Sequence, residues 1–228
     1  MYGSYGAAYR RAALRQRFLR GRKRGDEAAV GGAFDEIGAR EAALLRECGF
    51  ESGSLIDIGC GAGRLACALA GAPGVTYLGL DVSPALLESA RQRSGRQDWR
   101  FERVRGPVIP APDASADAVT AFSVFTHIPE AESLAYVREA RRVLKPGGFL
   151  LFSFLDPDVA QHRASLRAPW IEAVVTKLFW APNVATRAAD IARWADATGL
   201  RVRNIGGLLG QSYAVLELAQ TPNDAGAA

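Results

Sequence analysis

Three alternating glycines, Gly59, Gly61 and Gly63, follow a short apolar run that contains a single acid, Asp57. The run is typical of a buried strand, and the residues after the glycines have helical character. Glycine permits a positive φ angle and lets a ligand approach the main chain closely. The start of a helix also offers free N–H groups. Residues 55–70 therefore predict a strand, a glycine loop and a helix that open a ligand-binding α/β unit.

A second carboxylate, Asp81, ends the next apolar run, Thr76–Leu80. A carboxylate at the tip of the second strand, about 20 residues after a glycine loop, is placed to accept hydrogen bonds from a ribose diol. Asp81 could instead only cap the next helix, which Ser83 and Pro84 are suited to begin. Both features occur together and in order, which favours the ribose interpretation.

At this point the sequence resembles a known family. DIGCGAG (57–63) followed by LGLDVSPALLESAR (78–91) resembles motif I and the post-I acidic motif of class I S-adenosylmethionine-dependent methyltransferases. Residues 117–127 resemble the fourth strand of that family with its exit, and RRVLKPGGFLLFS (141–153) resembles the turn into the fifth. The resemblance covers roughly residues 34–218. A dinucleotide site usually carries G-x-G-x-x-G, whereas here the third glycine comes one residue early. An acid at position 57 would repel a pyrophosphate but suits the ammonium group of a methionine moiety.

The resemblance implies S-adenosyl-L-methionine as cofactor and S-adenosyl-L-homocysteine as product. It also implies a three-layer, Rossmann-like α/β fold with a mostly parallel seven-stranded sheet and an antiparallel last strand. In relatives an acid after the third strand often meets the adenine amino group, but Arg105 stands at that place and could stack on the ring. The cofactor-binding residues that we expect are Asp57, Gly59, Cys60, Gly61, Gly63, Asp81, Val82, Arg105, Phe122 and Ser123. No His, Cys and Asp set has the spacing of metal ligands, so we expect no metal.

The two histidines of the chain are both candidate site residues. His127 follows the predicted strand 118–123, at the sheet edge where ligands bind in open α/β folds. It is a candidate general base, or it holds the loop to the following helix. His162 lies in segment 156–185, which is longer than a strand-to-helix loop needs. Within that segment residues 169–180 have helical spacing, typical either of a core helix on the sheet or of a lid over the acceptor pocket. The expected substrate-binding residues are His162, Trp170, Phe179 and Trp180.

The basic charge is concentrated at the start of the chain. Of 28 Lys and Arg residues, eight fall in residues 1–24, which contain no acid, so the net charge of +4 becomes −4 for the remainder. We divide the chain into a basic N-terminal extension (1–32), a methyltransferase domain (33–220) and a disordered tail (221–228). Residues 7–20 predict a basic helix. It is a solvated extension, a cover over the cofactor mouth, or a contact for RNA, an anionic lipid head group or an acidic substrate. A transit peptide is a further interpretation, although the segment has little serine.

Composition is ordinary for a soluble globular protein, with 49% hydrophobic and 23% charged residues among 228. No apolar run approaches the ~20 residues of a transmembrane helix. Three cysteines without C-x-x-C spacing suit a reducing compartment, so we expect a cytoplasmic monomer or homodimer. The predicted function is O- or N-methylation of a small molecule. The alternatives are methylation of RNA or protein guided by the basic N-terminus, binding of S-adenosylmethionine without catalysis, and, more distantly, a nicotinamide oxidoreductase.

Overall fold

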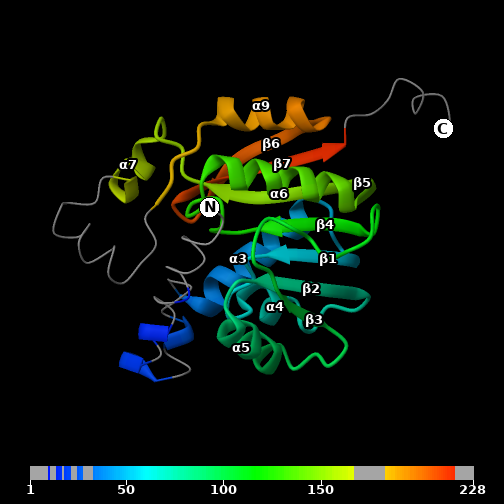
Figure 1. Ribbon diagram of the computed structural model, residues 1–228, viewed down its shortest axis with the longest axis vertical. Coiled ribbons are helices and arrows are strands. Elements are labelled where there is room, and N and C mark those ends of the chain that lie inside the picture. Colours follow the sequence, from blue (N-terminus) through cyan, green and yellow to red (C-terminus); the bar gives the residue numbers. More distant parts are fainter. Residues whose placement is uncertain are drawn as a thin grey trace.

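The computed structural model describes residues 10, 14–16, 18–21, 25–27, 33–166 and 183–218. Seven strands form one sheet in the order β3-β2-β1-β4-β5-β7-β6 (Figure 1). The strands are β1 (Gly53–Ile58), β2 (Val75–Asp81), β3 (Arg100–Arg103), β4 (Ala116–Ala121), β5 (Leu144–Phe154), β6 (Leu200–Leu208) and β7 (Gln211–Leu218). Only β7 runs antiparallel to its neighbours, β5 and β6. The predicted mostly parallel sheet with an antiparallel last strand is confirmed.

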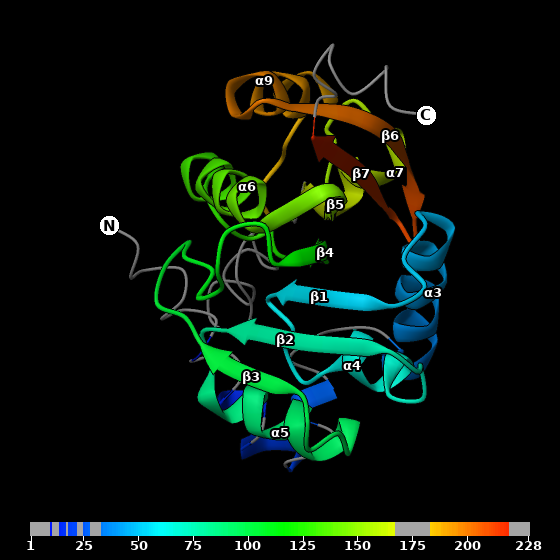
Figure 2. The same ribbon diagram turned by 90° about the vertical axis from the view of Figure 1, so that its right-hand side faces the viewer.

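Helices cover both faces of this sheet, and two hydrophobic clusters fill the space beneath them (Figure 2). The described helices are α3 (Phe34–Glu47), α4 (Arg64–Leu69), α5 (Pro84–Ser94), α6 (Glu130–Val143), α7 (Ala160–Leu166) and α9 (Ala188–Thr198). One cluster joins the sheet to α6 and α9 and includes Ile56, Ile58, Val137 and Trp194. The other joins the sheet to α3, α4 and α5 and includes Leu55, Leu45, Leu65 and Leu87. Because side chains alternate along a strand, Asp57 shares the face of Leu55 and points toward the α3–α4 layer.

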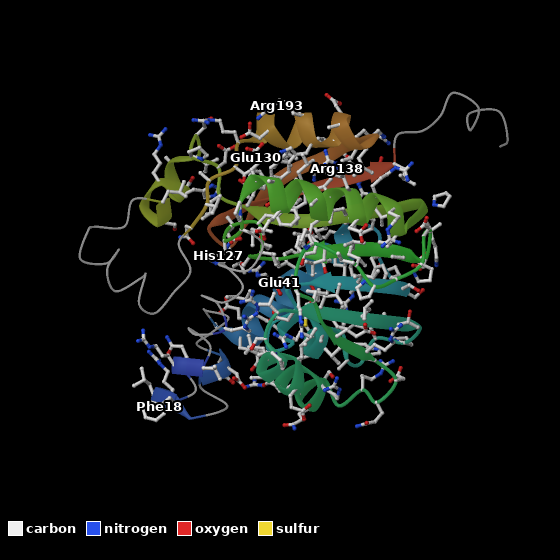
Figure 3. The ribbon with its side chains drawn as sticks, viewed as in Figure 1. Phe18, Glu41, His127, Glu130, Arg138 and Arg193 are labelled. Atoms are coloured by element: carbon white, nitrogen blue, oxygen red, sulfur yellow. The ribbon has the colours of Figure 1, made fainter. Side chains whose placement is uncertain are left out.

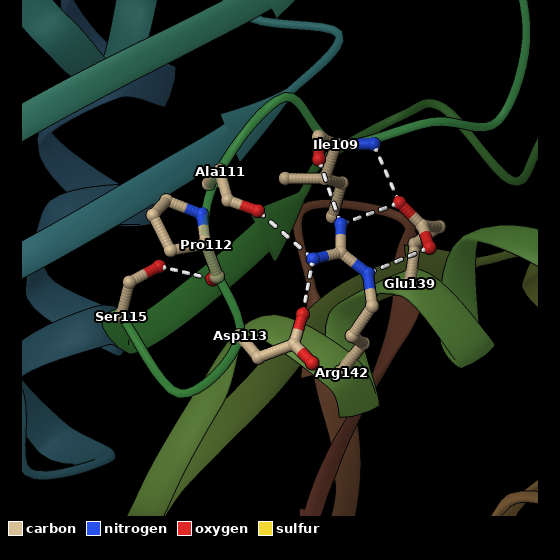
Figure 4. Close-up of polar contacts among 7 residues, drawn as sticks. All are labelled: Ile109, Ala111, Pro112, Asp113, Ser115, Glu139 and Arg142. Carbon is tan, nitrogen blue, oxygen red and sulfur yellow. Dashed lines mark hydrogen bonds and ion pairs between the residues drawn. The ribbon is translucent and has the colours of Figure 1, made fainter.

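The loop that leads into β4 is held by one arginine of α6 (Figure 4). Arg142 donates hydrogen bonds to the carbonyl oxygens of Ile109 and Ala111 and to the Asp113 carboxylate, at 2.8, 2.9 and 2.7 Å. Glu139 accepts from Arg142 and also from the Ile109 N–H, at 2.9 Å. These bonds tie an irregular proline-rich loop to helix α6.

The start of β5 differs from the prediction. The sequence Lys145–Gly148 suggested a turn after the helix, with the strand beginning at Phe149. Instead β5 begins at Leu144, and a bulge absorbs the extra residues, since Ala116 pairs with Leu144 and Ala118 pairs with Phe149. Within this bulge Lys145 donates to the Asp117 carboxylate at 2.8 Å.

The β6–β7 hairpin is also tighter than predicted. The sequence suggested a connection over residues 206–210, but the strands continue to Leu208 and resume at Gln211. The two linking residues, Leu209 and Gly210, have φ angles of +46° and +80°. Positive φ at both positions is typical of a two-residue turn whose twist matches the strands. Because Ser212 pairs with Phe154, the hairpin tip lies at the carboxyl end of β5.

Two predicted helices fall largely outside the described residues. The predicted helix over 169–180, with Trp170, Phe179 and Trp180, lies wholly outside them. Of the predicted helix over 7–20, residues 10, 14–16 and 18–20 are described, and all are helical. Among the described helices, none combines the length and apolar character that crossing a membrane requires.

Candidate functional site

The three glycines after β1 all adopt the left-handed conformation that their alternation suggested. Their φ angles are +68° for Gly59, +54° for Gly61 and +85° for Gly63. A Cβ atom at Gly59 would lie 2.3 Å from Cγ2 of Val124, and one at Gly63 would lie 2.8 Å from Cα of Ala90. The glycine loop is therefore packed tightly between the exit of β4 and helix α5, and side chains at these positions would force it apart.

Asp81, at the end of β2, fastens this loop. Its Oδ2 accepts a hydrogen bond from the Gly61 N–H at 3.1 Å, and its Oδ1 accepts from the Ser83 N–H at 2.7 Å. The Ser83 N–H lies at the start of α5, so Asp81 does cap this helix, as the alternative interpretation of the sequence predicted. An ionised carboxylate has about four acceptor positions, so both oxygens retain capacity for the two hydroxyls of a ribose.

Asp57 is held by side chains of the two strands that flank β1. Tyr77 on β2 donates its hydroxyl to Oδ2 at 2.5 Å, and Thr120 on β4 donates to Oδ1 at 2.8 Å. Thr120 is the direct pairing partner of Asp57. Tyr77 reaches Asp57 across Gly79, where a Cβ would lie 2.9 Å from the tyrosine ring. A glycine in the middle of β2 thus makes room for the contact.

A buried ion pair lies behind Asp57, between helices α3 and α4. Arg64, the first residue of α4, donates to Glu41 of α3 at 2.8 Å. Burial raises the pKa of Glu41 to about 7, although Arg64 opposes the shift. Figure 3 shows Glu41 beside the sheet in the α3 layer. The pair anchors the end of the glycine loop, because Arg64 directly follows Gly63 in the chain.

The electrostatics of the loop favour a cationic ligand. Burial raises the pKa of Asp57 to about 6, and the hydrogen bonds from Tyr77 and Thr120 only partly offset it. Burial likewise raises the pKa of Asp81 to about 6. Two acids whose charged forms are disfavoured would gain from a nearby positive charge, whereas a pyrophosphate would raise both pKa values further. The site therefore suits an ammonium or sulfonium group together with a diol.

The other predicted cofactor residues occupy different environments. Cys60 is buried, its N–H donates to the Leu80 carbonyl at 2.9 Å, and burial raises the pKa of its thiol well above the ordinary value. Phe122 is buried in the cluster beneath α3, α4 and α5. Val82 is half-buried against the opposite cluster, and Arg105 is exposed just after β3. Their contacts with a cofactor stay predictions.

Ser123 marks the exit of β4 with an unusual backbone. Its φ angle is +56°, a conformation that non-glycine residues rarely adopt. Its N–H donates to Oγ of Ser153 on β5 at 2.7 Å, and its hydroxyl accepts from the Gln211 amide at 3.1 Å. These partners, which the sequence did not suggest, join β4, β5 and the β6–β7 hairpin at one edge of the sheet.

The two histidines lie in different settings. His127 is half-buried, its N–H donates to the Val124 carbonyl at 2.9 Å, and Figure 3 shows it at the edge of the sheet beyond β4. His162, on α7, is buried, with Nδ1 at 2.9 Å from the Asp156 N–H. Its ring therefore fastens α7 to the end of β5, and only Nε2 remains for the substrate contact that was predicted.

Comparison with known proteins agrees with this geometry. Residues 56–152 match the protein-family model described as "Methyltransferase domain". Over 158 residues the chain is 31% identical to a "Ubiquinone biosynthesis O-methyltransferase" of Pectobacterium atrosepticum, covering 68% of this chain and 64% of the relative. A protein of the same name from Xanthomonas campestris pv. campestris is 29% identical over 160 residues, covering 68% and 65%. The chain thus spans just under two thirds of the length of these relatives.

Solved structures share the fold at low sequence identity. A chain from the complex between the Haloferax volcanii Trm112 methyltransferase activator and a methyltransferase has a TM-score of 0.69 at 18% identity, covering 96% of this chain and 99% of that one. Magnesium protoporphyrin IX methyltransferase from Synechocystis with bound SAH has a TM-score of 0.59 at 19% identity, covering 82% and 87%. The sheet order and the glycine loop define a Rossmann-like methyltransferase fold. The family model over residues 56–152 and the names of the relatives agree with this fold in pointing to a methyltransferase.

The raised pKa of Asp57 predicts a pH dependence of stability. A carboxyl that binds its proton more tightly in the folded protein than in the unfolded chain makes the free energy of unfolding fall as pH rises through about 4 to 6. The cost at neutral pH is at most on the order of 3 kcal/mol. The Tm of the wild type minus that of Asp57→Asn should therefore decrease by several degrees between pH 5 and 7. The same difference for Glu51→Gln, an exposed acid, should stay flat. A difference for Asp57→Asn that rises with pH would contradict the burial argument.

Proposed function

We propose that this chain transfers the methyl group of S-adenosylmethionine to an oxygen or nitrogen atom of a small molecule. The observation that carries the proposal is the pair of buried, incompletely neutralised carboxylates at the ends of β1 and β2 on either side of the glycine loop. Asp81 would hold the ribose hydroxyls, and Asp57 would attract the ammonium group of the methionine part. When bound, the cofactor would supply a methyl group on a sulfonium sulfur, which is an activated leaving group.

Oxygen is the acceptor atom that the relatives favour, since both of those described above carry the name O-methyltransferase. A neutral hydroxyl must lose its proton during the transfer, and an amine or an acidic hydroxyl needs less help. The protein then has to align the acceptor and, for a hydroxyl, take up its proton. The exit of β4, with Ser123 and His127, and the tip of the β6–β7 hairpin meet at the sheet edge where this acceptor would lie.

The proposal is tested by label transfer with the full chain. The protein is incubated with S-adenosylmethionine labelled on the methyl group and a lysate matched to its source, which is then separated into small-molecule, RNA and protein fractions. We expect label in the small-molecule fraction. Label confined to RNA or protein would instead support the alternative that uses the basic N-terminus. Binding of the cofactor without any transfer would support a non-catalytic role. The three cysteines are free thiols, which fits the cytoplasm as the compartment in which to look.

His127 is proposed as the general base for a hydroxyl acceptor. With the acceptor found by label transfer, His127→Gln should lower kcat by on the order of 100-fold, the lower end of what a positioned base contributes. The thermal shift caused by S-adenosylmethionine should stay unchanged, because no predicted cofactor contact is altered. Raising the pH toward the pKa of the acceptor should recover part of the rate. A loss of less than about threefold would assign His127 to holding the loop before α6.

A further inference from the structure

The N-terminal helical segment presents its apolar side chains outward. Leu14 and Phe18 are four residues apart, so they lie on one face of a helix. They are 58% and 90% exposed, whereas the polar Gln16 between them is only 5% exposed. A helix that packs on a protein normally does the reverse and turns its apolar stripe inward. Figure 3 shows Phe18 at the outer margin of the molecule, turned away from the sheet.

Among the described residues 14–16 and 18–20, the charged side chains are all basic. Arg15 and Arg20 are exposed within the same described helical turns, and Leu19 adds a third apolar side chain at 62% exposure. In sequence, the first 24 residues hold eight Lys and Arg and no acid. Exposed leucine and phenylalanine among arginines match the pattern of helices that lie in a membrane interface, with apolar side chains at the acyl boundary and cations at the head groups.

We infer that residues 14–16 and 18–20 dock this protein on the surface of an anionic lipid bilayer. An anionic bilayer fits this segment because its phosphates complement the arginines and its acyl region accepts the exposed apolar side chains. Phosphates of RNA would engage the arginines, but Leu14 and Leu19 would gain nothing there. Each basic residue near an anionic membrane contributes favourably, and each apolar side chain leaves water.

The N-terminal segment lies on the side of the molecule that carries the candidate site. Figures 1 and 3 show the N-terminal helical turns on the same side of the sheet as His127 and α7. A bilayer bound through Phe18 would therefore lie on the side of the molecule where the carboxyl ends of β1 and β4 open. An acceptor with a lipophilic part would reach the site from the membrane without crossing bulk water. The docking itself does not depend on the proposed transfer and is measured without cofactor or acceptor.

The test is co-sedimentation of the full chain with large vesicles. Vesicles of phosphatidylglycerol mixed with phosphatidylcholine are compared with vesicles of phosphatidylcholine alone. We expect binding to the anionic vesicles that weakens with salt. Phe18→Ser should lower the partition coefficient roughly tenfold, as expected for an aromatic side chain that no longer leaves water, and Leu14→Ser should lower it as well.

Val108→Ser is the matched control. Val108 is 60% exposed in the loop between β3 and β4, close to the 58% of Leu14, so Val108→Ser removes an exposed aliphatic side chain outside the N-terminal segment. Its binding should equal that of the wild type, and all variants should keep the wild-type Tm. Equal binding to both kinds of vesicle, no binding to either, or equal losses in Val108→Ser and Phe18→Ser would overturn the inference. Binding of a single-stranded oligoribonucleotide in place of vesicles would overturn it too.

Discussion

Asp81→Ala is expected to weaken binding of S-adenosylmethionine by roughly 10² to 10⁴-fold. Each hydrogen bond between a carboxylate and a ribose hydroxyl contributes about 1.5–3 kcal/mol, and the variant loses two. The variant also frees the Gly61 and Ser83 N–H groups, which Asp81 holds at 3.1 and 2.7 Å. The glycine loop would then lose its tie to α5, so the binding surface itself would be less well ordered.

Thermal unfolding with ligand measures this loss directly. In the wild type, ligand at a hundredfold its dissociation constant should stabilise the fold by about 2.7 kcal/mol, a rise in Tm of roughly 5–10 °C for a chain of this size. S-adenosylhomocysteine should act similarly, and NAD should cause no rise. Asp81→Ala should show at most about 0.4 kcal/mol of stabilisation with either sulfur ligand at the same concentration, and none with NAD.

Two controls separate the cofactor contact from general damage. Glu88→Ala removes an exposed acid from α5, the helix that follows Asp81, and should keep the full ligand-induced shift. Asp81→Asn keeps one acceptor oxygen and should keep part of it. A shift in Asp81→Ala within twofold of the wild-type value would show that the ribose is held elsewhere. A shift with NAD alone would contradict the cofactor class.

The glycine loop could be predicted because it rests on local chemistry. Alternating glycines before a helix, and an acid at the end of a short apolar run, restrict the backbone within a few residues. The mostly parallel sheet was implied instead by the resemblance of these motifs, in their order, to a known family. Asp57, Gly63 and Asp81 accordingly lie where their spacing placed them, at the carboxyl ends of β1 and β2 and in the loop between β1 and α4.

The contacts that complete the site depend on residues far apart in the chain. Gln211 reaches Ser123 across 88 positions, and Arg64 meets Glu41 only because α3 packs on α4. Neither pair has a sequence signal without knowledge of which helices and strands are neighbours. The contact of Thr120 with Asp57 is easier to predict. Once β1 and β4 are known to pair, Thr120 is the residue directly opposite Asp57. The bulge in β5 could not be predicted from the sequence either, because Lys145–Gly148 has the composition of a turn.

Gly63→Ala is expected to lower the free energy of unfolding by about 2–5 kcal/mol. A left-handed conformation costs an alanine about 1–2 kcal/mol, and φ at this position is +85°. The added Cβ would also lie 2.8 Å from Cα of Ala90, so helix α5 as a whole would have to move. Overpacking of this kind costs typically another 1–3 kcal/mol.

Gly95→Ala separates the two contributions in urea unfolding. Gly95 has a φ angle of +65° but no atom within 4 Å of an added Cβ, so its variant should show only the conformational cost. Ala90→Gly should not rescue Gly63→Ala, because it removes the Cβ of residue 90 but leaves its Cα in place.

Equal destabilisation by Gly63→Ala and Gly95→Ala would mean that helix α5 moves aside at no measurable cost. In that case the glycine loop would be less tightly enclosed than its contacts indicate, and cofactor binding would survive the substitution. If α5 is instead displaced, Gly63→Ala should weaken S-adenosylmethionine binding as well, because α5 begins three residues after Asp81.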